Sequence, residues 1–208
     1  MELFETIYKR RDIRKFRSDP IPSKVLLKIL GAAHQAGSVG FMQPWNFILV
    51  GDLSIRLKIK ELFEVENAKA SENYFGERKQ LYQSLKLEGI LEAPLNICVT
   101  CDRMRKGPHV LGRSSVIDTD IYSTCCSIQN LWLAARAEGV GVGWVSILNY
   151  DALRKLLMIP ENILPVAYLC VGYPVEFREQ PLLEEIHWED RLDLRSLIYS
   201  DIWGKEFC

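Results

Sequence analysis

Three arginines near the start of the chain are the first residues whose types and spacing suggest chemistry. Arg10, Arg11 and Arg14 lie where a predicted helix ends and a turn begins. Guanidinium groups make bidentate, charge-assisted hydrogen bonds, and two that converge suit a phosphate group. A solvated basic face would show the same pattern. The cluster therefore predicts either a phosphate site or an exposed basic surface.

Asp12 stands inside this cluster. A carboxylate beside a phosphate dianion is electrostatically unfavourable unless it has a role there. One interpretation is an internal salt bridge to Arg11 or Arg14. The other is a general base held in position for catalysis, which is the interpretation we favour.

A second block is a loop that enters a strand at Trp45. Gln43 and Asn46 supply side-chain amides, Ser38 supplies a hydroxyl, and the Pro44-Trp45 pair is rigid. Amides of this kind donate and accept hydrogen bonds in one plane. The loop therefore suits the polar edge of a flat heterocycle.

A third block runs from Gly141 through Gly143 and Trp144 to Ser146. It contains a G-x-G but lacks the third glycine of a dinucleotide-binding fingerprint, so that interpretation fails. Two glycines in a strand do permit close approach of a flat ligand. Ser146 is either a surface or capping residue, or a residue whose hydroxyl contacts a ligand at the end of that strand.

Apolar periodicity indicates which elements must position these residues. Their order predicts one α+β domain over residues 1–208, with a mixed central sheet flanked by helices and a C-terminal arm over 174–208. Helices are expected over 2–10, 22–35, 53–67, 76–90, 118–138 and 151–158 and near 193–200, and strands over 45–50, 95–101, 140–147 and 163–172.

Composition excludes several classes of protein. The chain has 208 residues, 48% of them apolar, and a net charge of −1. This balance gives no reason to expect a nucleic-acid or anionic-membrane partner. No apolar run approaches the roughly 20 residues of a membrane span, and the N-terminus does not resemble a signal peptide. We therefore expect a cytoplasmic protein.

No metal site is expected. The histidines are scattered, and the C-x-x-C of Cys98 and Cys101 has no second pair to complete a zinc site. These two cysteines fall in a predicted buried strand, where side chains three residues apart point to opposite faces. We interpret both as small buried apolar residues.

Taken together, the Arg-Arg-Asp-Ile-Arg block at 10–14, the Gly-Phe-Met-Gln-Pro-Trp block at 40–45 and the Gly-Val-Gly-Trp strand at 141–144 resemble the FMN sites of nitroreductase-like flavoproteins. The sequence of residues 38–47 most resembles that of one branch of this family. Members of that branch fragment reduced FMN with dioxygen to 5,6-dimethylbenzimidazole, the lower ligand of cobalamin. The resemblance covers essentially the whole chain. It implies an α+β nitroreductase-like fold, FMN as both cofactor and substrate, and a homodimer with sites between subunits.

The resemblance also implies roles for individual residues. Arg10 would bind the FMN phosphate, Arg14 would approach N1 and O2 of the flavin, and Asp12 would be needed for flavin breakdown. The backbone at Ser146 would face N5 and its hydroxyl would leave room for oxygen. Gly143 and Trp144 would line the ring, Ser38, Gln43 and Asn46 would contact the flavin or its ribityl chain, Arg191 would complete the phosphate site, and Lys86 would approach from the helical segment above.

Two departures from the wider family favour that branch. Phe41 stands where nitroreductases carry an asparagine, and Asp12 stands where they carry a serine. Two alternatives stay open: an NAD(P)H-dependent nitroreductase or flavin reductase that recycles FMN, and a non-catalytic FMN-binding protein. In the favoured interpretation NAD(P)H acts only indirectly, and a separate flavin reductase is a possible partner.

Overall fold

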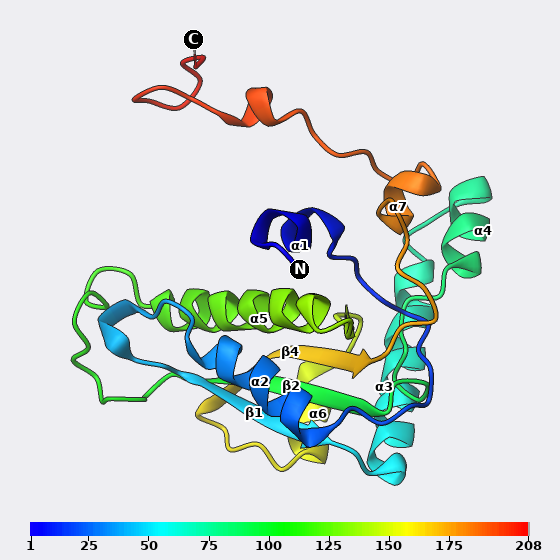
Figure 1. The fold of residues 1–208 in the computed structure, drawn as a ribbon, viewed down its shortest axis with the longest axis horizontal. Helices are drawn as coiled ribbons and strands as arrows, with labels where there is room; N and C mark the ends of the chain where they lie inside the picture. The colour runs from blue at the N-terminus through cyan, green and yellow to red at the C-terminus, as the bar shows by residue number, and fades with distance from the viewer. Residues whose placement is uncertain (208) are drawn as a thin grey trace. The chain divides into compact units, whose positions relative to one another are not determined.

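The structure is a computed structural model, and it describes residues 1–207. Its helices and strands follow the predicted order closely (Figure 1). The helices are α1 (Leu3–Lys9), α2 (Ser23–His34), α3 (Leu53–Ser71), α4 (Gly76–Ser84), α5 (Thr119–Ala137), α6 (Tyr150–Leu156) and α7 (Leu182–Glu185), with 3₁₀ turns at Val39–Phe41 and Leu194–Leu197. The strands are β1 (Trp45–Val50), β2 (Leu95–Asp102), β3 (Gly141–Trp144) and β4 (Ile163–Gly172).

The four strands form one sheet in the order β1-β2-β4-β3. Every pair of neighbouring strands is antiparallel, so the fold is α+β but the expectation of a mixed sheet was wrong for these strands. Parallel pairing among the described residues is confined to a single bridge between Asp12 and Val142. Asp12 belongs to an irregular segment that runs beside β3, which is why it adds no fifth strand.

Helices cover both faces of this sheet, as an α+β domain requires. On one face, Trp45, Ile97 and Leu131 belong to a buried cluster beneath α2 and α5. On the other, Ile59 and Phe63 of α3 pack in a second cluster. Figure 1 shows α5 lying along the sheet, with α1 on its outer side.

The two cysteines of the C-x-x-C point to opposite faces of β2, as predicted. Cys98 lies in the cluster beneath α3, whereas Cys101 hydrogen-bonds Thr124 of α5. Both side chains are fully buried. Neither shares a group of three metal-ligating side chains, since the described residues contain no such group.

Several predicted boundaries differ from the structure. The helix expected over 53–67 continues to Ser71. The helix expected over 76–90 ends at Ser84, and the backbone is extended at Leu85. Beyond it, Gly89 packs so tightly that a Cβ would lie 2.5 Å from the Phe16 ring. The strand expected over 140–147 is shorter, at Gly141–Trp144. The helix expected near 193–200 is one 3₁₀ turn, and α7 was not predicted at all.

The chain divides into two compact units, residues 1–177 and residues 178–208. Within the second unit Arg178 pairs with Glu185 of α7, and the rings of Tyr199 and Trp203 lie 4.7 Å apart. No helix among the described residues is long and apolar enough to span a membrane.

Candidate functional site

Residues 11–17 bring the N-terminal block against β3. The N–H of Ile13 donates to the Val142 carbonyl at 3.0 Å. The N–H of Trp144 donates to Asp12 Oδ1 at 3.0 Å, and Arg14 Nη2 donates to the Trp144 carbonyl at 2.8 Å. The first and third blocks of the sequence analysis are therefore one site.

Gly143 makes this contact possible. A Cβ built there would lie 2.0 Å from the Ile13 carbonyl oxygen and 2.6 Å from Arg14 Nη1. No side chain fits in that space. The groups that approach Gly143 closely are residues 13 and 14 of the chain itself.

Asp12 and Arg14 form an ion pair at the centre of the site. Arg14 Nη1 donates to Asp12 Oδ1 at 3.0 Å, and Nη2 contacts Oδ2. Burial nevertheless raises the pKa of Asp12, outweighing the opposing effects of Arg14, the Trp144 N–H and Arg10. The Asp12 side chain keeps 40% of its surface accessible. The ion pair to Arg14, one of the two interpretations, is thus present, and the general-base role stays a prediction.

The other two arginines lie at the end of α1. The Arg10 guanidinium stacks over the Trp132 ring of α5, 4.7 Å from its centroid. Arg11 Nη1 donates to the carbonyls of Tyr8 and Arg10 at 2.7 Å each. Arg11 therefore closes the end of α1, while Arg10 and Arg14 lie nearer to Asp12.

Trp144 and Ser146 extend the site along the end of β3. The rings of Trp144 and Trp132 are 6.4 Å apart, which joins the Arg10 side of the site to the strand. Ser146 follows two residues later and is exposed. Its carbonyl accepts from the N–H of Leu148 at 2.9 Å, which fixes the backbone there.

Ser38 and Gln43 occupy a separate loop at the other end of α5. Ser38 Oγ accepts from the Gln43 N–H at 2.8 Å and closes the loop, while Ser123 Oγ of α5 accepts from the Val39 N–H at 3.2 Å. Phe41 is 72% exposed at its tip. This loop therefore presents its tip to the outside of the molecule.

Asn46 faces the sheet surface under α6. Its amide donates to Thr100 Oγ1 at 3.2 Å and accepts from Arg105. It lines a hollow of about 300 Å³ together with Arg105, Thr100 and apolar residues between 157 and 163. Its polar atoms are thus engaged by the protein itself.

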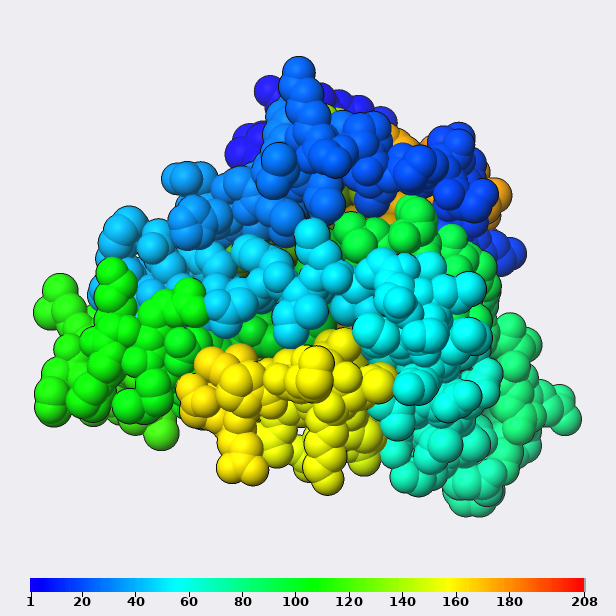
Figure 2. All heavy atoms as spheres, turned by 90° about the horizontal axis from the view of Figure 1, so that it is seen from below, coloured from blue at the N-terminus to red at the C-terminus, as the bar shows by residue number. Residues whose placement is uncertain are grey.

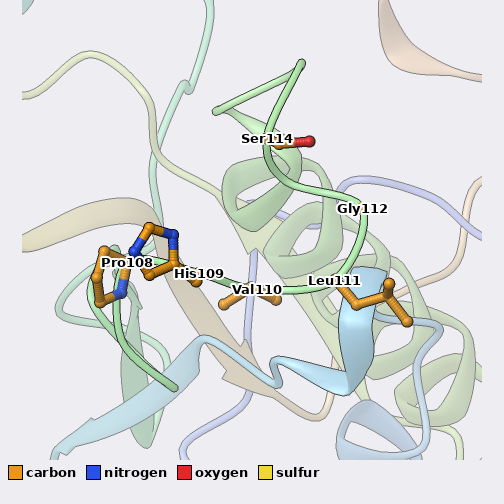
Figure 3. A pocket seen from close by; sticks show the side chains of 6 residues that line it. All are labelled: Pro108, His109, Val110, Leu111, Gly112 and Ser114. Atoms are coloured by element: carbon orange, nitrogen blue, oxygen red, sulfur yellow. The ribbon is translucent and has the colours of Figure 1, made fainter.

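Arg105 is a residue that the sequence analysis missed. No motif spacing links it to the Gln43 loop; only the pairing of β1 with β2, which sets Trp45 opposite Cys101, brings it there. A second hollow, of about 440 Å³, lies in the loop that follows Arg105. It is lined by Pro108, His109, Val110, Leu111, Gly112 and Ser114 (Figure 3). None of the predicted site residues lines it.

The two remaining predicted residues are Lys86 and Arg191. Lys86 pairs with Glu92 at 2.5 Å and Glu88 at 3.5 Å. Burial would lower the pKa of Lys86, but these carboxylates outweigh it and the pKa is raised. Arg191 is exposed in the unit of residues 178–208, whose position relative to the rest of the chain is not determined.

Within one chain the predicted residues thus form two groups. Asp12, Arg10 and Arg14 lie near Trp132, whereas the Ser38 loop lies near Ser123. At about 1.5 Å per residue, these two positions are roughly 14 Å apart along α5. The two groups therefore occupy different positions along α5 in one copy of the chain.

Known proteins are similar to this chain in sequence and in fold. The model of the nitroreductase family matches residues 7–173. The chain is 43% identical to a 5,6-dimethylbenzimidazole synthase of Rhodospirillum rubrum, over 88% of this chain and 86% of that protein. It is 40% identical to the protein of the same name in Rhodobacter capsulatus, over 91% and 92% of the two chains.

Solved structures share this architecture at low identity. Oxidized iodotyrosine deiodinase bound to FMN and 3-iodo-L-tyrosine superposes with a TM-score of 0.71 at 23% identity, covering 85% of this chain and 92% of that one. The Vibrio harveyi NADPH:FMN oxidoreductase gives a TM-score of 0.71 at 20% identity, covering 98% and 78%. These similarities establish the shared fold. The match to the family model and the similarity to the Rhodospirillum rubrum protein show that the chain belongs to the nitroreductase family.

Proposed function

We propose that this chain is a 5,6-dimethylbenzimidazole synthase. It would fragment reduced FMN with dioxygen and release 5,6-dimethylbenzimidazole and erythrose 4-phosphate. The similarity to two synthases at 40% identity or more supports this activity. The observation that carries it is Asp12, an accessible carboxylate of raised pKa held between Arg14 and the end of β3.

The donor set around Asp12 suits FMN. Arg10 and Arg14 bring two guanidinium groups near the Asp12 carboxylate, and such groups bind phosphorylated, anionic ligands. We assign Arg10 to the phosphate and Arg14 to the N1 and O2 edge, where a cation stabilises the charge of the reduced flavin. Arg11 contributes its charge from the end of α1. Arg191 and Lys86 stay as proposed outer contacts.

Asp12 would act as the general base. Reduced FMN supplies the electrons that dioxygen takes up, and the chain must move a proton at the ribityl side. The Trp144 N–H and Arg14 hold the carboxylate in one orientation. Ser146, exposed just beyond Trp144, would offer its backbone and hydroxyl to the N5 side of the ring.

A second copy of the chain would complete the site. The Ser38–Gln43 loop lies near Ser123, whereas the Asp12 group lies near Trp132, and the tip of the loop is exposed. The outer face of α1 carries Leu3, Phe4 and Tyr8 with more than 60% of each surface accessible. Apolar exposure on this scale is typical of an interface. We therefore propose a homodimer in which the loop of one subunit meets the Asp12 group of the other.

The decisive experiment is to incubate the chain with chemically reduced FMN in air and to seek 5,6-dimethylbenzimidazole by mass spectrometry. The proposal requires product in proportion to the FMN lost, and no sustained NAD(P)H oxidation by this chain alone. Many turnovers of NAD(P)H against a nitroaromatic without loss of flavin would identify a reductase instead. FMN that is bound and never consumed would identify a binding protein. A separate flavin reductase would supply reduced FMN in the cell.

A further inference from the structure

The loop that ends in β1 has an unusual backbone. Gly40, Phe41 and Gln43 all have positive φ, at 57°, 51° and 49°. Residues with a Cβ rarely adopt this left-handed conformation, and they keep it only when their surroundings hold them there. Something must therefore stabilise Gln43 in this state.

Arg105, in the turn that follows β2, provides that stabilisation. Its Nη1 donates to the carbonyl of Gln43 at 3.1 Å and to that of Trp45 at 3.3 Å. Its Nη2 donates to Asn46 Oδ1 at 2.5 Å. One planar guanidinium thus bridges the residues on both sides of Pro44, which a single ammonium group cannot do with the same geometry.

The segment that carries Arg105 is itself anchored. Arg105 Nε lies 3.5 Å from Asp102 Oδ2, and the Asp102 N–H donates to the Pro44 carbonyl at 2.7 Å. Further along, Arg113 donates to the Arg103 carbonyl at 2.6 Å and to the fully buried Asp120 at 2.8 Å. The base of the loop over residues 103–117 is therefore rigidly connected to α5.

This loop also packs directly on the left-handed turn. A Cβ at Gly40 would lie 2.5 Å from the Leu111 carbonyl oxygen, and one at Gly112 would lie 3.0 Å from Val39. Figure 2 shows residues 103–117, in green, at the edge of the molecule beside the blue-to-cyan atoms of the Gln43 loop. The two loops form one continuous unit on the surface.

We propose that Arg105 is a positioning residue that presents Gln43 to the flavin. This inference rests on the proposed function, because it assumes that the Gln43 loop contacts FMN. Arg105 does not touch the ligand itself. It acts through the two carbonyls and the one amide that it binds, and so sets how tightly the loop engages FMN.

The test compares FMN dissociation constants, measured by quenching of flavin fluorescence, for the parent and for Arg105→Ala, Arg105→Lys and Gln43→Met. Loss of charge-assisted hydrogen bonds predicts roughly tenfold weaker binding for Arg105→Ala. Arg105→Lys keeps the charge but should restore only a minor part of the lost FMN affinity. It also keeps the test valid if the alanine variant does not fold. The double variant Arg105→Ala/Gln43→Met should bind no more weakly than Gln43→Met alone, since the two changes act through one contact. The visible absorption band of bound FMN should shift in the same variants.

The matched control is Arg154→Ala. Arg154 of α6 donates to the Glu161 carbonyl at 3.3 Å and does not touch the Gln43 loop. It should leave FMN binding unchanged. The inference is overturned if Arg105→Ala binds FMN like the parent, if lysine restores binding fully, or if the Arg105 and Gln43 effects simply add. A parent chain that binds FMN but never consumes it would contradict the proposed function while leaving the role of Arg105 intact.

Discussion

The side chain of Asp12 accepts a hydrogen bond from the backbone N–H of Trp144 at 3.0 Å, across 132 residues of sequence. This bond fixes a carboxylate at the end of β3, where the neighbouring Gly143 lets residue 13 approach closely. A residue held by the backbone of a strand is better oriented than one on a free loop. In the proposed mechanism, this bond and the ion pair with Arg14 would hold Asp12 in place as the general base.

Asp12→Asn separates chemistry from binding. Asparagine keeps the size of the side chain and can still accept from the Trp144 N–H, but it is not a base. A general base contributes typically 10²–10⁴-fold to a rate. We expect the variant to fold and to bind FMN, yet to form 5,6-dimethylbenzimidazole at least about 100-fold more slowly, as measured by mass spectrometry. Near-normal product formation would remove Asp12 from the mechanism and leave Ser146 as the catalytic candidate.

The same substitution should have a pH-dependent effect on stability. Burial raises the pKa of Asp12 above its ordinary value of 3.8 in the folded state. Between 3.8 and the folded-state pKa the folded chain binds more protons than the unfolded chain, so the contribution of Asp12 to the free energy of unfolding falls as pH rises. The Tm of Asp12→Asn relative to the parent should therefore increase as pH rises from 4 and then level off. A difference that shrinks over this range would mean that the Arg14 ion pair outweighs burial.

Local sequence patterns predicted the elements better than their junctions. The strands Trp45–Val50 and Ile163–Gly172 were predicted at their observed bounds, because continuous apolar runs follow proline or polar turns there. The segment after Ser84 was predicted as helix and is not helical; Gly89 in this segment packs on Phe16, which is a tertiary contact. The periodicity of apolar residues in the sequence does not reveal such a contact.

The candidate site divides in the same way. Residue types alone indicated that Arg10, Asp12 and Arg14 could act together, and the structure places them together. The sequence could not show that Gly143 accommodates residue 13 in place of a ligand, or that Arg105 holds the Gln43 loop. Both depend on which strands become neighbours, and hydrogen bonds between distant residues leave no periodic signal.

Gly143→Ala should be strongly destabilising. Its Cβ would lie 2.0 Å from the Ile13 carbonyl oxygen, so the backbone of residue 13 must move away from β3. We expect a loss of at least about 2 kcal/mol in the free energy of unfolding, measured by denaturant titration. The matched control is Gly31→Ala in α2, where a Cβ meets nothing within 4 Å. That variant should be more stable by roughly 0.5–1 kcal/mol. Equal effects at the two positions would contradict the packing described for β3.

The cysteines should differ sharply in reactivity. Burial raises the pKa of both Cys98 and Cys170 to about 12, so at pH 8 only about one thiol in 10⁴ is a thiolate. Cys125 and Cys126 of α5 are exposed. Alkylation of the native chain, mapped by mass spectrometry, should modify Cys126 while Cys98 and Cys170 react only after unfolding. Rapid native alkylation of Cys98 would favour a redox role for the C-x-x-C over the structural one.

Mixing two defective variants tests whether the site is shared between subunits. Arg10→Ala should weaken FMN binding by about 1.5–3 kcal/mol through loss of a charge-assisted phosphate contact. Gln43→Met should weaken it from the loop side. In a heterodimer of the two, one site would carry both defects, while the other would pair an intact Arg10 with an intact Gln43.

Random reassortment makes half of the dimers mixed, so about a quarter of the parent's sites should be restored. The variants are unfolded together, refolded as a mixture and assayed for FMN binding at a concentration that saturates only the parent. Each variant refolded alone is the control and should remain defective. Recovery to about a quarter of parental binding supports a shared site. If the mixture binds no more FMN than the average of the two variants, both groups act on the flavin within one subunit or not at all, and the proposed dimeric site is wrong.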